Sequence, residues 1–429
     1  MMVVASSVAQ VVKRILFALL LISGFSFIVY ELIHWLTPEE SWVLHDSDDS
    51  SYSSATVPHG KSSRILLVSS LFLISKSKHS KEQYRDWLQR FLQPITTEVY
   101  LYTSPDVAST VQAARGRGLQ ITIDTNYNTP FDVPPLKGLE GWYDTMHRMD
   151  REKSYHSPEL YSIWNAKPFF VDNAIRVMES KGKTYDYVFW CDGGSFRYSH
   201  VYMNWPDPSR IEEIWQEGSR LSGTKAEDLL FFPIQNPPYS ARRWKEEKGP
   251  IDIDFSEGEH VLLISSPPLR SKYHLGSFFG GSPSTMAWWA RTFYTYHDYY
   301  VSKRLFVGKD QTVFNAILML FNERIITVWV NDPKAPAADK SWRYKSWSNS
   351  LGSCGDEWYY YQFWLSNRQT RDEMGKIWLE NDKQAQNVRW WKKISQCRLT
   401  RVLALSSLLK RVFGEEWKAP IPTLDASLR

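Results

Sequence analysis

Cysteine is scarce in this chain of 429 residues, which has only Cys191, Cys354 and Cys397. The three show no CxxC or Cys/His spacing, and this argues against a structural zinc site. In an oxidising compartment one pair can form a disulfide and leave a free thiol, and the sequence does not choose the pair. A strong net charge is also absent, because 51 Lys and Arg against 47 Asp and Glu leave a formal charge of +4. No nucleic-acid partner is therefore expected.

Motifs of two common enzyme classes are missing as well. No GxSxG segment occurs, which argues against a serine hydrolase of that type. A nucleotidyltransferase would have a glycine-rich basic loop directly after the first strand. Here the first strongly apolar run of the main domain leads into Ser75-Lys76-Ser77-Lys78, which contains no glycine. Nucleotidyl transfer thus stays only a secondary alternative.

The chain does have a long apolar stretch near its start. Residues 15–36 are rich in Leu, Ile and Phe, and at about 1.5 Å per residue a helix of this length spans roughly 30 Å of hydrocarbon. Lys13 and Arg14 precede it and acidic residues follow it, which predicts that residues 1–14 are cytosolic. We expect a single-pass type II protein of the Golgi or endoplasmic reticulum membrane, whose remaining chain is lumenal. A cleaved signal peptide is the alternative.

Residues 37–63 are rich in Ser and Asp and indicate a flexible stem. After them, from residue 64 to 333, apolar runs alternate with segments of helical spacing. This alternation predicts βαβ units, and therefore an α/β, Rossmann-like domain with a mostly parallel sheet. One helix is expected to open at Pro168, because proline suits a first turn. Strands are expected at residues 64–74, 98–103, 119–124, 185–191, 261–265 and 325–330.

Residues 334–429 form an aromatic-rich extension and a basic helical tail. Between Lys383 and Gly414 there are eight Lys or Arg and no Asp or Glu. This composition fits a solvated helix face, or a surface that meets a partner or an anionic membrane.

The strongest local motif is VFWCDGGSFR, residues 188–197. Asp192 follows an apolar strand, at the sheet edge where ligands of open α/β sheets bind. Glycosyl transfer from a nucleotide sugar expels a diphosphate, whose charge Mg²⁺ or Mn²⁺ or basic side chains neutralise. Asp192 is the predicted metal ligand, and Gly193 and Gly194 would allow close approach of the sugar. A plain strand-end turn is the other interpretation.

Three further segments carry candidate residues. Asn165 and Lys167 are suited to nucleotide or phosphate contact, or are simply solvated. The glycine pair Gly280-Gly281 precedes a helix and can bind an anion or an acceptor sugar, or form a capped turn. Asp310 is a candidate general base, or a helix cap.

Together, WNAKP at 164–168, YVFWCDGG at 187–194, FGGS at 279–282 and Asp310-Gln311 with Asn315 resemble the HtrL/YibB-like glycosyltransferase family. More loosely they resemble nucleotide-diphospho-sugar transferases of the GT-A fold. The resemblance covers about residues 64–333 and implies a GT-A-type domain that binds a nucleotide-sugar donor. It aligns Asp192 with the first acidic residue of the metal-binding DxD motif, whereas Gly194 stands at the third position, so metal-independent transfer stays open. The implied donor-binding residues are Asn165, Lys167, Trp190, Asp192, Gly193, Gly194, Ser195 and Arg197, the acceptor- or sugar-binding residues are Gly280, Gly281 and Ser282, and the catalytic residues are Asp310 and Gln311.

The sequence therefore predicts a membrane-anchored lumenal glycosyltransferase, which moves a sugar from a nucleotide sugar to a glycan or glycoconjugate acceptor. The missing second Asp favours an alternative, in which the chain is an inactive pseudoenzyme or a glycan-binding module.

Overall fold

Eight strands form one mixed sheet in the order β3-β2-β1-β4-β6-β5-β7-β8. Only β6 and β8 run against the others, so the predicted α/β class with a mostly parallel sheet is confirmed. The strands are β1 (Ile65–Leu71), β2 (Glu98–Thr103), β3 (Ile121–Asp124), β4 (Tyr187–Cys191), β5 (Leu230–Phe231), β6 (Phe278–Gly281), β7 (Ile325–Val328) and β8 (Val402–Ala404).

A computed structural model of the chain describes residues 63–74, 76–77, 79–150, 152–234, 237, 241–251, 276–330, 332–336, 351–384 and 395–424. These residues belong to one structural unit, Lys61–Arg429. The predicted cytosolic tail, the anchor, almost all of the stem and the strand expected at 261–265 lie outside the described residues. Among the helices that the structure describes, none is both long and apolar enough to cross a membrane.

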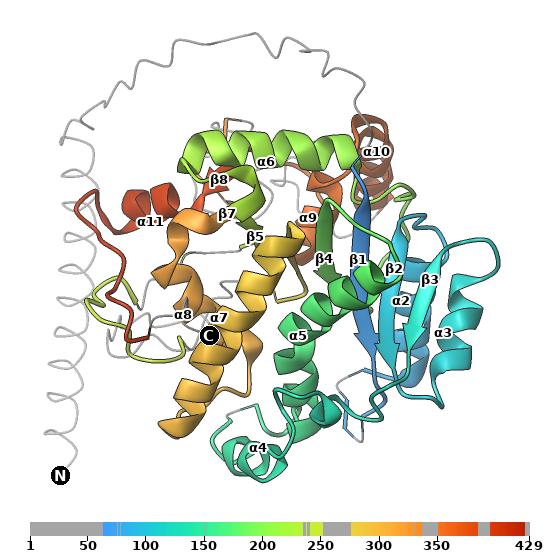
Figure 1. Cartoon of the computed structure of the whole chain (residues 1–429). Helices are drawn as coiled ribbons and strands as arrows, with labels where there is room; N and C mark the ends of the chain where they lie inside the picture. The colour runs from blue at the N-terminus through green and yellow to red at the C-terminus, as the bar shows by residue number, and fades with distance from the viewer. Residues whose placement is uncertain are drawn as a thin grey trace, which may run out of the picture. The chain divides into compact units, whose positions relative to one another are not determined.

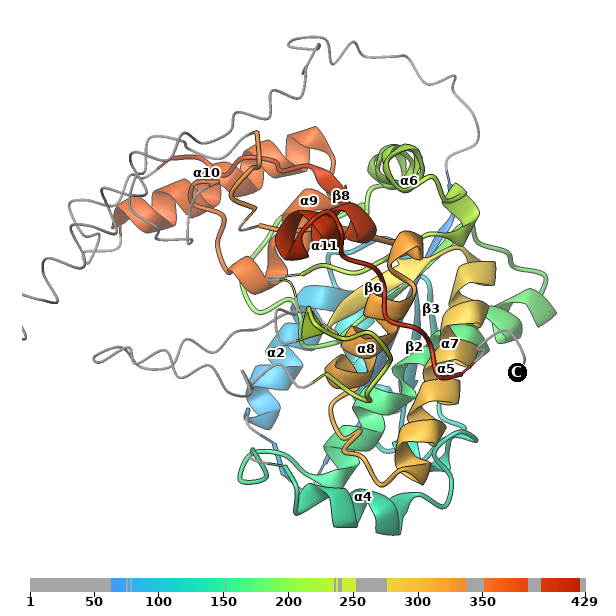
Figure 2. The same cartoon turned by 90° about the vertical axis from the view of Figure 1, so that its left-hand side faces the viewer.

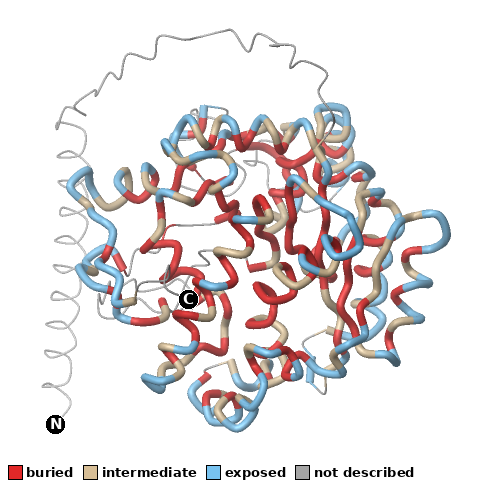
Figure 3. Tube along the Cα trace, viewed as in Figure 1, coloured by how far each residue is buried: buried red, intermediate tan, exposed pale blue. Residues whose placement is uncertain are grey.

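Helices cover both faces of the sheet (Figures 1 and 2). Along β1 the side chains of Leu66 and Val68 pack with one helical layer, and those of Ile65 and Leu67 pack with the other. The strands between the layers are buried along most of their length (Figure 3). The first layer contains α4 (Glu140–His147), α5 (Pro158–Ser180), α7 (Pro283–Ser302), α8 (Asp310–Leu320) and α11 (Leu405–Phe413), and the second contains α2 (Lys81–Leu92), α3 (Ala108–Arg115), α6 (Pro208–Ser222), α9 (Tyr360–Trp364) and α10 (Arg368–Gln384).

The long helix α5 corrects the prediction that a helix opens at Pro168, because it begins ten residues earlier at Pro158 and contains Pro168 in its interior. Proline in a helix removes one N–H donor and displaces the preceding turn. The Tyr294 hydroxyl, from α7, enters the backbone at this place: it donates to Asn165 O (2.8 Å) and accepts from Phe169 N (3.3 Å). It thus bridges these two backbone groups.

Tyr294→Phe tests how much these two hydrogen bonds of the Tyr294 hydroxyl contribute to stability. We expect the substitution to lower the free energy of unfolding by about 1–3 kcal/mol, because both backbone groups lose a buried partner. Urea unfolding of the full-length chain measures it. Tyr299→Phe on the same helix is the control, with an expected change within about 0.5 kcal/mol. Equal effects of the two substitutions would contradict this account.

The C-terminal extension completes the sheet through β8, which pairs antiparallel to β7. Cys354 and Cys397 form a disulfide, and Cys191 is free and buried. Two arginines of the predicted basic tail form ion pairs with one buried acid: Arg401 and Arg411 contact the two oxygens of fully buried Asp332, at 3.1 and 2.9 Å. These arginines therefore hold the extension to the end of β7.

Candidate functional site

A pocket of about 310 Å³ opens at the carboxyl ends of the neighbouring strands β1 and β4. The chain moves from β1 to β2 and β3 towards one edge of the sheet, and then returns to place β4 on the other side of β1 (Figure 1). Strand order thus reverses between β1 and β4, which is the position where open α/β sheets bind their ligands. The loops that follow β1 and β4, one face of α5 and Tyr359 line the pocket.

At the base of the pocket, Lys167 of α5 lies between two carboxylates. Its ammonium is 3.2 Å from Asp192 Oδ1 and 3.0 Å from Asp310 Oδ2, and it donates to Gly276 O at 2.9 Å. The Lys167 side chain is 3% exposed and that of Asp192 is 33% exposed. Burial alone would lower the pKa of Lys167, but Asp192 and Asp310 raise it above its ordinary value. Lys167 is therefore a buried cation that joins α5 to the end of β4 and the start of α8.

The loop after β4 fixes the Asp192 carboxylate. Trp190 Nε1 donates to Asp192 Oδ1 at 2.6 Å, and the backbone N of Asp192 donates to Ser277 O at 2.9 Å. Ser195 closes the turn, because its backbone N and its hydroxyl both donate to Asp192 O. A Cβ at Gly194 would lie 3.3 Å from the Trp87 ring. This loop therefore presents one carboxylate in a fixed orientation.

Cationic and aromatic side chains form the wall beside this loop. The Arg197 guanidinium lies over the rings of Trp87 (4.5 Å) and Tyr359 (5.6 Å). Tyr84 meets Trp87 edge to face, and Lys81 lines the same part of the pocket. A planar guanidinium held on aromatic rings is suited to bidentate contact with phosphate oxygens.

Of the residues predicted to bind the donor, all but Asn165 line this pocket. Asn165 is fully buried and donates to Tyr143 Oη and Val307 O, so its role in this structure is to hold α5 to neighbouring segments. Asp310 joins the cluster only from behind Lys167, and neither it nor Gln311 lines the pocket. Asp310 Oδ1 accepts from Gln311 N, and Lys309 rather than Asp310 is the cap residue of α8.

The three residues predicted to bind the acceptor lie elsewhere. Because β6 is antiparallel to β4, Gly280 and Gly281 pair with Phe189 and Val188, away from the carboxyl end of β4. A Cβ at Gly280 would lie 2.3 Å from Phe189 Cδ1. Close strand packing thus explains the glycine there. Ser282 accepts from Thr285 N and caps α7, as the capped-turn alternative expected.

Burial raises the pKa of Asp310 to about 6, although Lys167 opposes the shift. One ammonium between two carboxylates leaves an excess negative charge, and the burial of Asp310 favours the protonated form of its carboxyl group. On mild acidification, the cluster of Lys167, Asp192 and Asp310 therefore gains a proton at Asp310.

The residues present do not fit Mn²⁺ or Mg²⁺ at Asp192. Both cations prefer several oxygen ligands, whereas Asp192 Oδ1 already meets the Lys167 ammonium and the Trp190 indole N–H. In the described part of the chain no group of three or more His, Cys, Asp or Glu side chains is arranged to hold a metal ion. At this carboxylate, Lys167 takes the position that a cation would need.

Sequence reasoning missed several pocket residues. Tyr155 and His156 lie in the loop before α5, and Tyr359 comes from the C-terminal extension. Ser157, which caps α5, followed by Pro158 and Glu159 is a helix-start signal that would have placed His156 at the entry of α5.

The chain matches no protein-family model, and no curated protein sequence is significantly similar to it.

Proposed function

We propose that this chain is a glycosyltransferase that binds a nucleotide sugar in the pocket between β1 and β4. The proposal depends on three features found together. The pocket lies where the strand order reverses, the Asp192 carboxylate is held in one orientation, and Arg197 is held over aromatic rings. Hydroxyl groups of a sugar donate hydrogen bonds to a carboxylate, and a diphosphate needs cationic partners.

The charges suggest how the donor lies. Lys167 is already shared by Asp192 and Asp310, so it is not a free phosphate ligand. The diphosphate is better placed near Arg197 and Lys81, with the sugar hydroxyls at Asp192. The leaving diphosphate is then stabilised by basic side chains, and the resemblance to GT-A transferases applies to the fold and the donor rather than to a DxD metal site.

The disulfide supports a lumenal location. Cys354–Cys397 would persist in an oxidising compartment, such as the secretory lumen. The basic residues before the apolar segment 15–36 and the acidic residues after it likewise predict that the chain after this segment is lumenal. We therefore infer a type II membrane protein of the Golgi or endoplasmic reticulum that acts on a glycan or glycoconjugate.

Binding of UDP-, GDP- and CMP-sugars to the full-length chain in detergent tests the proposal. Trp164 and Trp190 line the pocket, so their fluorescence reports occupancy. We expect one nucleotide class to bind and, at 100 times its dissociation constant, to stabilise the fold by about 2.7 kcal/mol. Arg197→Gln should weaken binding roughly 10- to 100-fold, the effect of one charge-assisted hydrogen bond.

Arg176→Gln is the control, because Arg176 is exposed on α5 and paired with Asp172; its affinity should equal that of the wild type. Absence of binding by every nucleotide sugar, in a well-folded sample, would reject the donor site. Binding without any turnover would favour the alternative of an inactive transferase-like binding protein, which the single carboxylate at Asp192 also suggests.

A further inference from the structure

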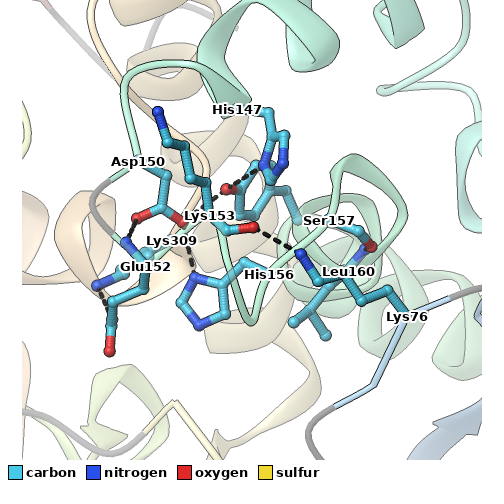
Figure 4. A network of polar contacts seen from close by, with 10 residues as sticks. Lys76, His147, Asp150, Glu152, Lys153, His156, Ser157, Leu160 and Lys309 are labelled. Carbon is cyan, nitrogen blue, oxygen red and sulfur yellow. Dashed lines mark hydrogen bonds and ion pairs between the residues drawn. The ribbon is translucent and has the colours of Figure 1, made fainter.

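A second polar network lies at the entry of α5, around the carboxylate of Asp150 (Figure 4). Asp150 is 5% exposed. Its Oδ2 accepts from Tyr161 Oη at 2.6 Å and from His156 Nδ1 at 2.7 Å, and its Oδ1 accepts from Glu152 N at 2.9 Å. Neither the core packing nor the proposed donor site requires this buried acid.

The hydrogen bonds determine which nitrogen of His156 carries the proton. Burial alone would raise the pKa of Asp150, but the bonds from His156, Tyr161 and the backbone lower it well below its usual range. An ionised carboxylate only accepts, so Tyr161 donates its hydroxyl proton to Asp150 and itself accepts from His147 Nδ1 at 3.0 Å. His156 must likewise donate through Nδ1. In the neutral ring, Nε2 then has a free lone pair.

That lone pair is directed away from Asp150, as the orientation of the ring in Figure 4 shows. His156 lines the pocket, its side chain is 15% exposed, and in the described part of the chain Nε2 has no hydrogen-bond partner. The His156 ring packs edge to face with the rings of Trp164 and Tyr161, at centroid separations of 5.1 and 6.2 Å, and these contacts fix it. The pair Asp150–His156 therefore has the arrangement of an oriented proton acceptor.

His156 and Lys167 lie along one wall of the pocket, together with Leu160, Ile163 and Trp164. From Pro158 to Lys167 the helix axis rises about 14 Å, and helical side chains lean towards the N-terminus, so the Lys167 ammonium is nearer to His156 than this rise suggests. Asp192 beside Lys167 would hold the donor sugar, which leaves the space towards His156 and Tyr155 for an acceptor.

We propose that His156, oriented by Asp150, is the general base that activates the acceptor hydroxyl. The acceptor oxygen forms a bond to the anomeric carbon while its proton passes to His156 Nε2. The bond from the anomeric carbon to the phosphate oxygen of the nucleotide breaks, and its electron pair leaves with the nucleotide. His156 then returns the proton to solvent. This single displacement inverts the configuration of the sugar, and the inference rests on the proposed transferase function.

The structure disfavours Asp310 for this role. A general base must reach the proton that it removes, and Asp310 is enclosed behind Lys167 outside the pocket lining. His156 is in the pocket and has its own orienting carboxylate. Asp150 is accordingly a positioning residue.

Nucleotide release from the UDP-, GDP- or CMP-sugar that binds tests the inference, with the full-length chain and with water, free monosaccharides or disaccharides as acceptors. His156→Gln should lower kcat roughly 10²- to 10⁴-fold and leave the donor dissociation constant within about threefold. Asp150→Asn should lower kcat by a similar order, because an amide can donate to Nδ1 and force the proton onto Nε2.

The pH profile separates a base from a merely structural group. A general base acts only in its unprotonated form, so wild-type kcat should fall on acidification, and the residual kcat of His156→Gln should lack this fall. The charged groups near the ring are Asp150, Glu152 with its partner Lys309, Lys153, and Lys76, which donates to Lys153 O. Glu152→Gln should shift the profile without removing it.

The outcomes distinguish the two proposals. A wild-type chain that binds no nucleotide sugar rejects the transferase itself. A chain that binds a donor but releases no nucleotide with any of these acceptors overturns the role of His156 and leaves the donor site standing. Wild-type turnover in His156→Gln, or an unchanged acidic fall, also overturns it, as does a product that retains configuration.

Discussion

Lys167→Met is expected to destabilise the chain by about 3–5 kcal/mol, because it leaves two carboxylates facing one another without their shared cation. Lys167 is 3% exposed and contacts both Asp192 and Asp310. The loss should depend on pH. Without the ammonium, Asp310 becomes still easier to protonate in the folded state, so acidification restores part of the stability, and the deficit should be larger at pH 8 than at pH 4.

Urea unfolding at the two pH values measures the effect. Lys181→Met is the control, because Lys181 is exposed at the end of the same helix and should change stability by less than about 0.5 kcal/mol. The double variant Lys167→Met/Asp310→Asn should recover part of the loss, since it removes one of the two uncompensated charges. A deficit below about 1 kcal/mol that is equal at both pH values would show that Lys167 does not hold this cluster.

Much of the fold could be predicted because its elements are local patterns. Apolar runs bounded by glycine and polar residues gave the strand now seen at Tyr187–Cys191 almost to the residue, and the helix expected after Gly280-Gly281 is α7. The predicted start of α5 was wrong because each of two prolines, Pro158 and Pro168, is compatible with a first helical turn. Pro158 follows the capping Ser157, whereas the backbone next to Pro168 is bridged by a hydroxyl supplied by α7, which no local pattern reveals.

The candidate site was predicted residue by residue but not as an arrangement. Lys167, Asp192 and Asp310 were each selected, yet their mutual contact depends on how α5 crosses the sheet towards α8. For this reason Lys167 was expected to bind phosphate, and Asp310 to face the substrate. The structure instead places one buried ammonium between the two acids.

Two further differences between the sequence-based predictions and the structure have the same physical origin. Gly280 was a candidate for binding the acceptor or sugar, with a capped turn as the alternative, and the strand beside it leaves no room for a side chain at this position. Asp150 and His156 had no periodic signal in a loop-rich stretch, and only the bonds that Tyr161 and His156 donate to Asp150 show that the acid is part of a network. Tertiary packing decides both cases.

Asp192 and Asp310, the two acids that contact Lys167, allow two matched substitutions that test the donor site. Asp192 lines the pocket and its side chain is 33% exposed, whereas that of Asp310 is 4% exposed and lies behind the lysine. Asp192→Ala is therefore expected to lower donor turnover by about 10²- to 10³-fold, with a small change in stability. Asp310→Asn should keep turnover within about tenfold, because the asparagine does not meet the sugar.

Asp310→Asn should instead change how stability depends on pH. In the wild type the pKa of Asp310 is about 6 in the folded chain, above its ordinary value of 3.8, so the folded state binds more protons than the unfolded state between these two values. The stabilisation from this proton is present below about pH 4 and is lost as the pH rises through about 6. Relative to the wild type, Asp310→Asn should thus become more stable by roughly 2–3 kcal/mol over that interval.

Nucleotide release and urea unfolding between pH 4 and 7 measure the two effects on the same pair of proteins. If Asp310→Asn abolishes turnover while Asp192→Ala retains it, the assignment of the pocket-facing acid is reversed. If neither substitution affects turnover, the donor sugar does not bind at this cluster. The expected result separates the acid that meets the sugar from the acid that fixes Lys167, and the distinction depends only on which side of the lysine each carboxylate occupies.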